Sequence, residues 1–364
     1  MKNKEFWDYT GKLLLLVALV IGFVSLSMNI ISLYFEKKNP YQPNVYQAPV
    51  EENQVINVLG AGDVVYGNKA IEEQSYQRTL ENLYSMVSNY DMSVYNQVSM
   101  LGNDVPIAFG ESMEGLGIKA VSLANPDSLK YGKEGIDTSL AFFENSKLYT
   151  AGTYGSTDQK NLLRHFEVNG ISIIMLSYTD YLNNPLPEHE QYLVNVYDDV
   201  RTPEVVAEAA SLVDFVIVSI SWQGEDGALP NDHQKEIAKA LADAGASMIV
   251  GHAENAIQPV NWIDDTLIFY SLGNFVSDNP ELEDRIGVVG GVTVTKSTLY
   301  DKKKIELTNP RVDLVYSMPS GGRFIAKPLS WFNETELPEK EELYQKYKQL
   351  LQSMDDSIRV GGIQ

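Results

Sequence analysis

The feature that most constrains this chain is an apolar run near its N-terminus. Residues 13–35 contain no charged side chain, and they begin with Leu-Leu-Leu-Leu-Val-Ala-Leu-Val-Ile. At ~1.5 Å per residue, a helix of this length crosses the ~30 Å hydrocarbon core of a bilayer. We therefore expect a transmembrane helix over 13–35. The alternative is a cleaved signal peptide, but Tyr34, Phe35, Glu36 and Lys37 stand where small residues would mark a cleavage site.

The segments on either side of this run predict how the chain is arranged about a membrane. Lys2, Lys4 and Lys12 precede the run, whereas Lys37 and Lys38 follow it. The positive-inside rule then places residues 1–12 in the cytoplasm and the main domain outside the cell. Residues 36–54 hold three prolines among Asn, Gln and Tyr, so we expect a linker there.

The charge of the remaining chain excludes some partners. The formal net charge is -21, and residues 39–364 carry 23 basic and 46 acidic side chains. A field of this sign repels phosphate backbones, so we expect no nucleic-acid partner. The chain has no cysteine, which excludes disulfides, thiolate metal sites and cysteine nucleophiles.

Short apolar segments alternate with helical periodicity along the rest of the chain, which predicts an α/β domain over 55–300. We expect strands at residues 55–61, 92–95, 118–124, 171–178, 215–221, 248–252 and 267–272. We expect helices at residues 70–88, 135–145, 203–212 and 232–244. Two further amphipathic strands are expected at 286–295 and 304–314. Residues 301–364 are expected to form a helical C-terminal extension, with a charged helix at 339–354.

Polar side chains follow most of these expected strands, at the edge where ligands bind in open α/β sheets. The residues at the strand ends are Asp63, Asn96, Asn125, Asp127, Ser221, Trp222, Glu225 and His252. Together they predict one polar site. The alternative for each residue alone is a strand terminator or helix cap, because Gly, Asn, Asp and Ser favour turns.

An ordered series of segments in the second half of the chain resembles the CapA/PgsA family of capsule-synthesis proteins. The segments are Pro-Asn-Asp-His-Gln at 230–234, Ala-Asp-Ala-Gly-Ala at 242–246, Ile-Val-Gly-His at 249–252 and Phe-Tyr-Ser-Leu-Gly-Asn-Phe-Val at 269–276. The resemblance covers residues 55–278. It implies a metallophosphoesterase-like αββα sandwich, a cluster of metal-binding Asp, Glu, Asn and His at strand ends, and a membrane-anchored role in poly-γ-glutamate assembly.

The chain departs from the family pattern at the metal-binding motifs. Asp63 and Asn96 match the family's Asp and Asn, but Val98 stands where the family has Glu. One further motif, at residues 124–132, carries Asp127 in place of its His and Lys130 in place of its Asp. Ser221 replaces the His of the His-Trp-Gly motif, and one His of three remains, at His252. A two-metal centre needs several carboxylate and imidazole ligands, so we expect no metal and no other cofactor.

The resemblance and its departures together predict a CapA-like subunit that binds a surface polymer or precursor and has lost metal-dependent catalysis. Its expected partners are the membrane, other membrane subunits of a polymer synthase, and the polymer. The alternative is an active metal-dependent hydrolase or transferase, with a divalent ion held by Asp63, Asn125, Asp127 and His252. The expected pocket residues are Asp63, Asn96, Asn125, Asp127, Ser221, Trp222, Glu225, His252, Asn255 and Asn274.

Overall fold

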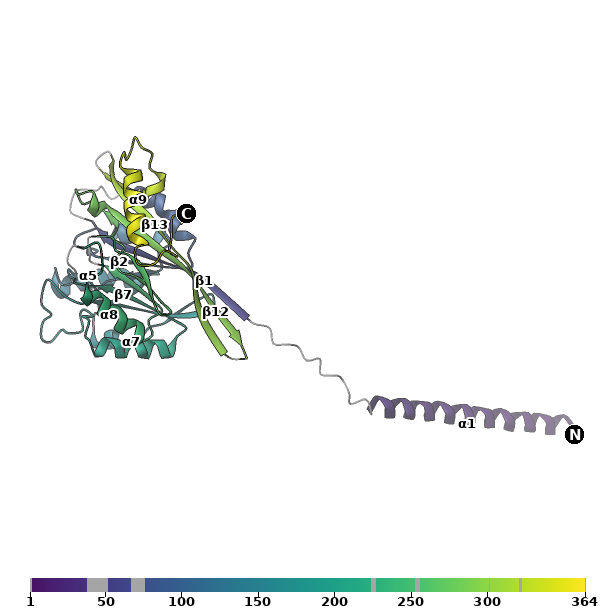
Figure 1. Ribbon diagram of the computed structural model, residues 1–364. Coiled ribbons are helices and arrows are strands. Elements are labelled where there is room, and N and C mark those ends of the chain that lie inside the picture. The colour runs from purple at the N-terminus through teal and green to yellow at the C-terminus, as the bar shows by residue number, and fades with distance from the viewer. Residues whose placement is uncertain are drawn as a thin grey trace. The chain divides into compact units, whose positions relative to one another are not determined.

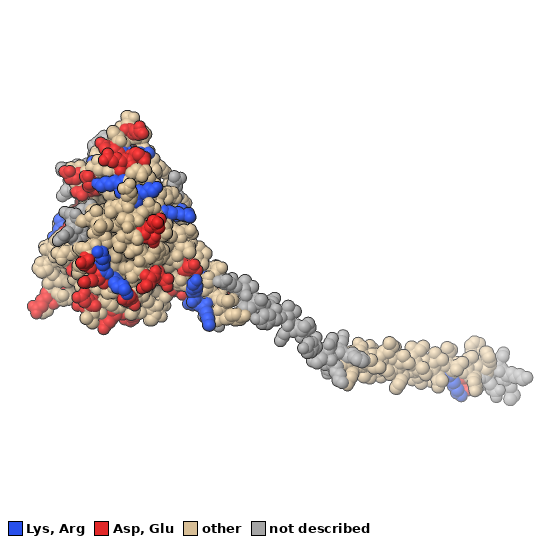
Figure 2. Space-filling view, in the orientation of Figure 1, with Lys and Arg blue, Asp and Glu red and all other residues tan. Residues whose placement is uncertain are grey.

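The computed structural model of the chain describes residues 2–37, 52–66, 76–223, 227–252, 256–300, 302–320 and 323–363. These residues fall into two compact units, Met1–Val50 and Glu51–Gln364. The first unit contains the helix α1 (Lys2–Lys37), which is labelled in Figure 1. Within α1, the stretch Phe6–Tyr34 has a mean hydropathy of 2.6 and is long and apolar enough to cross a membrane. In Figure 2 the described side chains of this helix are mostly uncharged, whereas acidic side chains are spread over the visible face of the second unit.

The second unit is built on two β-sheets, and sheet 1 has nine strands. Its main order is β14-β13-β12-β1-β2-β3-β4, with β11 paired to β1 and β15 paired to β13. Strands β1 to β4 run parallel, β12 is antiparallel to both β1 and β13, and β13 is antiparallel to β14 but parallel to β15. The strands are β1 (Glu52–Val65), β2 (Met92–Gln97), β3 (Ala120–Ser122), β4 (Tyr149–Ala151), β11 (Asn274–Ser277), β12 (Ile286–Leu299), β13 (Lys302–Ser320), β14 (Arg323–Pro328) and β15 (Arg359–Val360).

Sheet 2 has six strands in the order β5-β6-β7-β8-β10-β9. Its central strands β6, β7, β8 and β10 are parallel, and the edge strands β5 and β9 are antiparallel to their neighbours. The strands are β5 (Phe166–Val168), β6 (Ile171–Thr179), β7 (Phe215–Ser221), β8 (Met248–His252), β9 (Val260–Ile263) and β10 (Thr266–Phe269).

The two sheets pack face to face, and helices cover their outer faces. The central core and the outer cores follow from the alternation of side chains along each strand, because successive side chains point to opposite faces of the sheet. Ile56 and Val58 of β1 share the central core with Ile217 of β7, whereas Leu59 and Val218 lie in the two outer cores. This confirms the expected αββα sandwich.

One outer core lies between sheet 1 and the helices α2 to α5, and the other lies between sheet 2 and the helices α7 and α8. Figure 1 shows α7 and α8 side by side over β7. The helices are α2 (Tyr76–Leu80), α3 (Tyr84–Ser88), α4 (Ile107–Gly115), α5 (Gly132–Asn145), α6 (Thr157–Asn161), α7 (Arg201–Leu212), α8 (Asp232–Asp243) and α9 (Lys340–Leu351). Short 3-10 turns occur at Glu81–Leu83, Glu283–Arg285 and Leu329–Trp331.

The division expected at residue 300 is corrected by the structure. It falls at the turn of a hairpin, where Leu299 of β12 pairs with Lys302 of β13. The residues after it add β13, β14 and β15 to sheet 1, and Leu343 and Leu351 of α9 pack into the central core. The C-terminal residues are therefore part of the same compact unit, and most of their regular structure is strand.

Two boundaries expected near the N-terminus also change. The chain enters β1 at Glu52, so the last residues of the expected linker 36–54 belong to the sheet, and residues 38–51 lie outside the described part. Of the helix expected at 70–88, the described portion is broken into α2, a 3-10 turn and α3. The expected helices at 135–145, 203–212 and 232–244 correspond to α5, α7 and α8.

Candidate functional site

The carboxyl ends of β1, β2, β7 and β8 bring four predicted polar residues together, two from each sheet. In sheet 1, Asp63 is in register with Asn96 of β2, just after an irregularity in the pairing between Gly60 and Asp63. In sheet 2, Ser221 is in register with His252. Register partners in parallel strands point their side chains to the same face, so each pair faces the opposite sheet.

These four residues, here called the strand-end cluster, connect the two sheets. Asn96 Nδ2 donates to Asp63 Oδ1 over 2.9 Å and to Ser221 Oγ over 3.4 Å. The Ser221 hydroxyl donates in turn to the Ala124 carbonyl over 3.1 Å. His252 Nδ1 lies 3.1 Å from Asp63 Oδ1, and all four side chains are buried. The cluster is therefore a polar contact inside the sandwich.

Some atoms at these strand ends are buried without a hydrogen-bond partner among the described residues. They are Asn96 Oδ1, both ring nitrogens of His252, and Asn274 Oδ1. His252 Nδ1 lies 3.1 Å from Asp63 Oδ1 but makes no hydrogen bond with it. Buried polar atoms in native proteins are normally paired, so these are the atoms that a bound water or small ion would contact.

The described donors do not fit a two-metal centre. Within the described ranges, no group of three or more His, Asp or Glu side chains is arranged to hold a metal ion. Asp63 and His252 are the ionisable members of the strand-end cluster, and a dinuclear centre needs several such ligands. The predicted pocket residues Glu225 and Asn255 lie outside the described residues.

Two of the predicted residues instead stabilise a turn after β3. Asn125 Nδ2 donates to the Gln97 carbonyl over 3.0 Å, and Asn125 Oδ1 accepts from the backbone N–H of Asp127 over 3.0 Å. Asp127 Oδ1 accepts from Asn183 Nδ2 over 2.8 Å. Asn125 thus closes an Asx-type turn, and the Asp127 side chain is engaged by Asn183, which favours the terminator alternative for this pair.

Two more of the predicted pocket residues are also buried. The ring of Trp222 packs in the core between sheet 2 and its helices, and its Nε1 donates to the Tyr270 carbonyl over 2.9 Å. Asn274 is in register with Asp63, and its Nδ2 donates to the Asp284 carbonyl over 2.8 Å. Trp222 therefore belongs to the core rather than to a groove, whereas Asn274 lies beside the strand-end cluster.

Lys130, which the family resemblance places at the position of an Asp, forms an ion pair with Asp104, which is not a member of the strand-end cluster. Its Nζ lies 2.7 Å from Asp104 Oδ1, and the Tyr131 hydroxyl donates to the same oxygen. Partial burial of Asp104 opposes ionisation, but the hydrogen bonds from Lys130, Met100 N and Tyr131 outweigh it and lower the pKa of this carboxyl. This ion pair therefore holds the Lys130 ammonium group beside Asp104.

Sequence reasoning missed an acid–imidazole pair beside this site. Asp180 follows β6, its Oδ2 lies 2.9 Å from His233 Nε2, and its Oδ1 accepts from the Gln223 backbone N–H. Burial raises the pKa of Asp180, because desolvation of the carboxylate exceeds the effect of these hydrogen bonds. The sequence did give one indication of this pair, because Asp180, like the other site residues, lies at the end of a strand. His233 is exposed near the start of α8, and its local sequence gives no sign of this partner.

The αββα sandwich and the polar side chains at its strand ends together define the class of protein, and the sequence then shows the family. The family model described as "Bacterial capsule synthesis protein PGA_cap" matches residues 57–279, which is more than half of the chain. The chain therefore belongs to the bacterial capsule synthesis protein family. This confirms the resemblance to the CapA/PgsA proteins.

Two curated relatives are similar to part of this chain. The "PGA biosynthesis protein CapA" of Bacillus subtilis (strain 168) is 27% identical over 246 residues, covering 62% of this chain and 64% of that protein. The "Capsule biosynthesis protein CapA" of Bacillus anthracis is 33% identical over 168 residues, covering 44% of this chain and 41% of that protein. The chain thus spans less than two thirds of the length of either relative.

Two solved structures are similar at low sequence identity. TT1561 of Thermus thermophilus is 10% identical with a TM-score of 0.39, covering 70% of this chain and 98% of that chain. The 5'-nucleotidase from Candida albicans is also 10% identical with a TM-score of 0.39, covering 68% of this chain and 48% of that chain.

Proposed function

We propose that this chain is a membrane-anchored subunit of cell-surface polymer synthesis or export, which binds a capsule-type polymer or its precursor without metal-dependent catalysis. The observation that carries the proposal is the strand-end cluster, where one carboxylate and one imidazole are held in contacts between the two sheets. Family membership and the capsule and PGA biosynthesis names of the two relatives support the biological setting.

The anchor in this proposal is α1, with its N-terminus in the cytoplasm and the second unit outside the cell. Its length and apolar composition support a single crossing, and the distribution of flanking lysines supports the orientation. Protease added to intact cells should then digest the second unit. A second unit that survives in intact cells, yet is digested after lysis, would contradict this orientation.

Deleting the gene from its host tests the role in polymer assembly. We expect the amount of surface polymer to fall, because a binding or assembly subunit would be missing. Expression of the full chain should restore it, whereas a variant without residues 1–37 should not, because it lacks the proposed anchor. An unchanged amount of surface polymer in the deletion strain would contradict the proposal.

The second candidate is a metal-dependent hydrolase or transferase that acts on the same class of polymer. It is favoured by the buried atoms of Asn96, His252 and Asn274 that have no hydrogen-bond partner within the described part of the chain. If they fit an ion, these residues and Asp63 would hold it through oxygen and imidazole donors, and the ion would supply Lewis acidity. This candidate requires that the purified chain retain metal through Asp63 and His252.

A further inference from the structure

A cavity of about 750 Å³ lies at one edge of the sandwich, and no member of the strand-end cluster lines it. Its walls come from β4 of sheet 1, β6 of sheet 2, the end of α5, α6 with the segment that follows it, and the start of α7. This volume is within the range of ~300–1,000 Å³ that is typical of small-molecule sites. The cavity therefore has room for a ligand independent of the strand-end cluster.

Lys160 provides a half-buried ammonium group in this cavity. Its Nζ donates to the carbonyls of Gln191 over 2.6 Å and Val194 over 3.1 Å. Both acceptors are neutral, and no carboxylate of the described residues lies within 4.0 Å of this ammonium. Burial lowers the pKa of Lys160, because the charged form loses hydration. An anion beside Nζ would supply the missing counter-charge.

Arg164 provides a second cation at the other side of the cavity. Its Nη2 donates to the Thr150 carbonyl over 3.1 Å, and its guanidinium lies 4.8 Å from the centre of the Tyr149 ring. These two contacts hold the side chain in place but use little of its donor capacity, since a guanidinium has five N–H groups. It too has no ion pair with a described carboxylate, in a chain whose formal net charge is -21.

Acidic residues also line the cavity, but they lie at its exposed rim. Glu144 and Glu208 are exposed. The Asp198 carboxylate accepts hydrogen bonds from the backbone N–H groups of Val200 and Arg201 at the start of α7, so its charge is already hydrogen-bonded. Arg201, also at the rim, pairs with Glu204 over 3.2 Å. The rim charges are thus satisfied by hydrogen bonds, ion pairs or solvent, whereas the Lys160 ammonium donates to neutral carbonyls.

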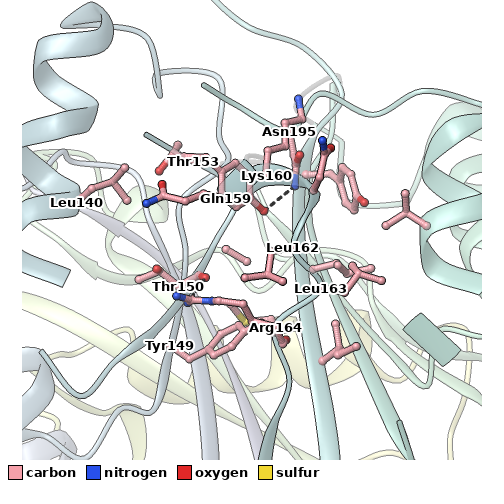
Figure 3. Close-up of a pocket in the computed structure, with 18 of the residues that line it drawn as sticks. Leu140, Tyr149, Thr150, Thr153, Gln159, Lys160, Leu162, Leu163, Arg164 and Asn195 are labelled. Carbon is pink, nitrogen blue, oxygen red and sulfur yellow. Dashed lines mark hydrogen bonds between the residues drawn. The ribbon is translucent and has the colours of Figure 1, made fainter. Parts of the chain in front are cut away.

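The two cations are separated by an apolar stretch. Figure 3 shows Lys160 with Gln159, Thr153 and Asn195 on one side of the cavity, and Arg164 with Tyr149 and Thr150 on the other. Leu162 and Leu163 lie between these two groups in the same view. A complementary ligand would carry negative charge at both ends and aliphatic carbon in the middle.

We propose that this cavity binds a dicarboxylate whose two carboxylates are joined by a short aliphatic chain, one contacting Lys160 and the other Arg164. A free dicarboxylic acid and a segment of a polymer with carboxylate side groups share this chemistry. The proposal goes beyond the function proposed above, because it holds for a binding subunit and for an enzyme alike. It also does not depend on whether the strand-end cluster holds a metal ion.

Isothermal titration calorimetry of the full chain in lipid nanodiscs tests this proposal with three probes: glutarate, a γ-linked glutamate oligomer and inorganic phosphate. We expect saturable binding of glutarate or of the oligomer, and the probe that saturates at the lower concentration identifies a free acid or a polymer as the ligand. Lys160→Met and Arg164→Gln should each weaken binding about tenfold or more, because each removes a charged hydrogen bond. The control Lys239→Met removes an exposed lysine of α8 that pairs with Asp243, so binding should not change.

Two variants are needed because Lys160 also holds the segment at 191–194, and its replacement alone could disturb folding. Arg164 is exposed, so Arg164→Gln should leave the thermal unfolding temperature unchanged. The proposal is overturned if neither carboxylate probe binds, if phosphate binds more tightly than both, or if a folded Arg164→Gln variant binds as well as the parent chain.

Discussion

Gly251 in β8 is the residue on which the packing of Trp222 depends. A Cβ at this position would lie 2.0 Å from the Tyr270 carbonyl oxygen and 2.5 Å from a ring carbon of Trp222. The backbone oxygen cannot move without disturbing the neighbouring strand, so Gly251→Ala should lower the free energy of unfolding by about 3 kcal/mol. Urea denaturation measures this change. Gly115→Ala is the matched control, because nothing lies within 4 Å of its added Cβ, and a loss of stability as large as that of Gly251→Ala would contradict the account.

The position of a residue at the end of a strand predicted well which polar residues lie close together. It predicted less well which contacts each of these residues makes. Asp63, Asn96, Ser221 and His252 lie together because parallel strands end at the same edge of a sheet. The same reasoning failed for Trp222, because a residue just past a strand can turn into either core. It could not find the partner of His233, since Asp180 is 53 residues away and only the tertiary fold brings the two together.

The hairpin of β12 and β13 is tied to sheet 2 through Asp214, which precedes β7. Lys296 Nζ lies 2.7 Å from Asp214 Oδ2, Lys303 Nζ lies 3.2 Å from Oδ1, and Ser172 donates to Oδ2 through its N–H and hydroxyl. Burial alone would raise the pKa of Asp214, but these donors outweigh it and hold the pKa well below its usual range. The contact therefore stabilises the fold only while Asp214 is ionised.

Asp214→Asn should lower the free energy of unfolding by about 3 kcal/mol at neutral pH, because it leaves the largely buried Lys296 ammonium without its counter-ion. A carboxyl with a lowered folded-state pKa contributes stability above its unfolded pKa of about 4 and loses it as the pH falls further. The parent chain should thus lose stability below about pH 4 more steeply than the variant. Chemical denaturation across this range measures both effects.

Glu306→Gln is the control for Asp214→Asn, since it removes an exposed carboxylate that pairs with Lys304 in the same hairpin. Exposed pairs contribute little, so its stability should match that of the parent chain. If Asp214→Asn were as stable as Glu306→Gln at neutral pH, the contact between the hairpin and sheet 2 would not have the assigned role.

Elements with strong periodicity were predictable, whereas short or mixed ones were not. The strand expected at 215–221 is β7, and 248–252 is β8, because both are continuous apolar segments between turn residues. The helix α4 was missed, since its sequence Ile-Ala-Phe-Gly-Glu-Ser-Met-Glu-Gly carries two glycines that weaken a helical pattern. The edge strands β4 and β5 have three residues each, too few for periodicity to appear.

At the scale of the whole molecule, the C-terminal residues show what a sequence pattern leaves out. The amphipathic strands near residues 286–295 and 304–314 were expected, but not that they would form one hairpin within sheet 1. Strand pairing depends on contacts distant in sequence, such as those between β1 and β12, which local patterns do not encode. The same limit applies to the edge cavity, whose walls come from segments between residues 140 and 208.

The measurement that most directly tests the central claim is the metal content of the purified full chain. The chain is incubated with Mn²⁺, Zn²⁺, Fe²⁺, Mg²⁺ or Ca²⁺, separated from free metal, and analysed by elemental mass spectrometry beside Asp63→Asn, His252→Gln and the exposed-residue control Asp232→Asn. We expect far less than stoichiometric metal in the parent chain and no difference among the variants, because the described donors are too few for a dinuclear centre. Near-stoichiometric metal in the parent and in Asp232→Asn, lost in Asp63→Asn and His252→Gln, would contradict the account and establish the metal-dependent alternative.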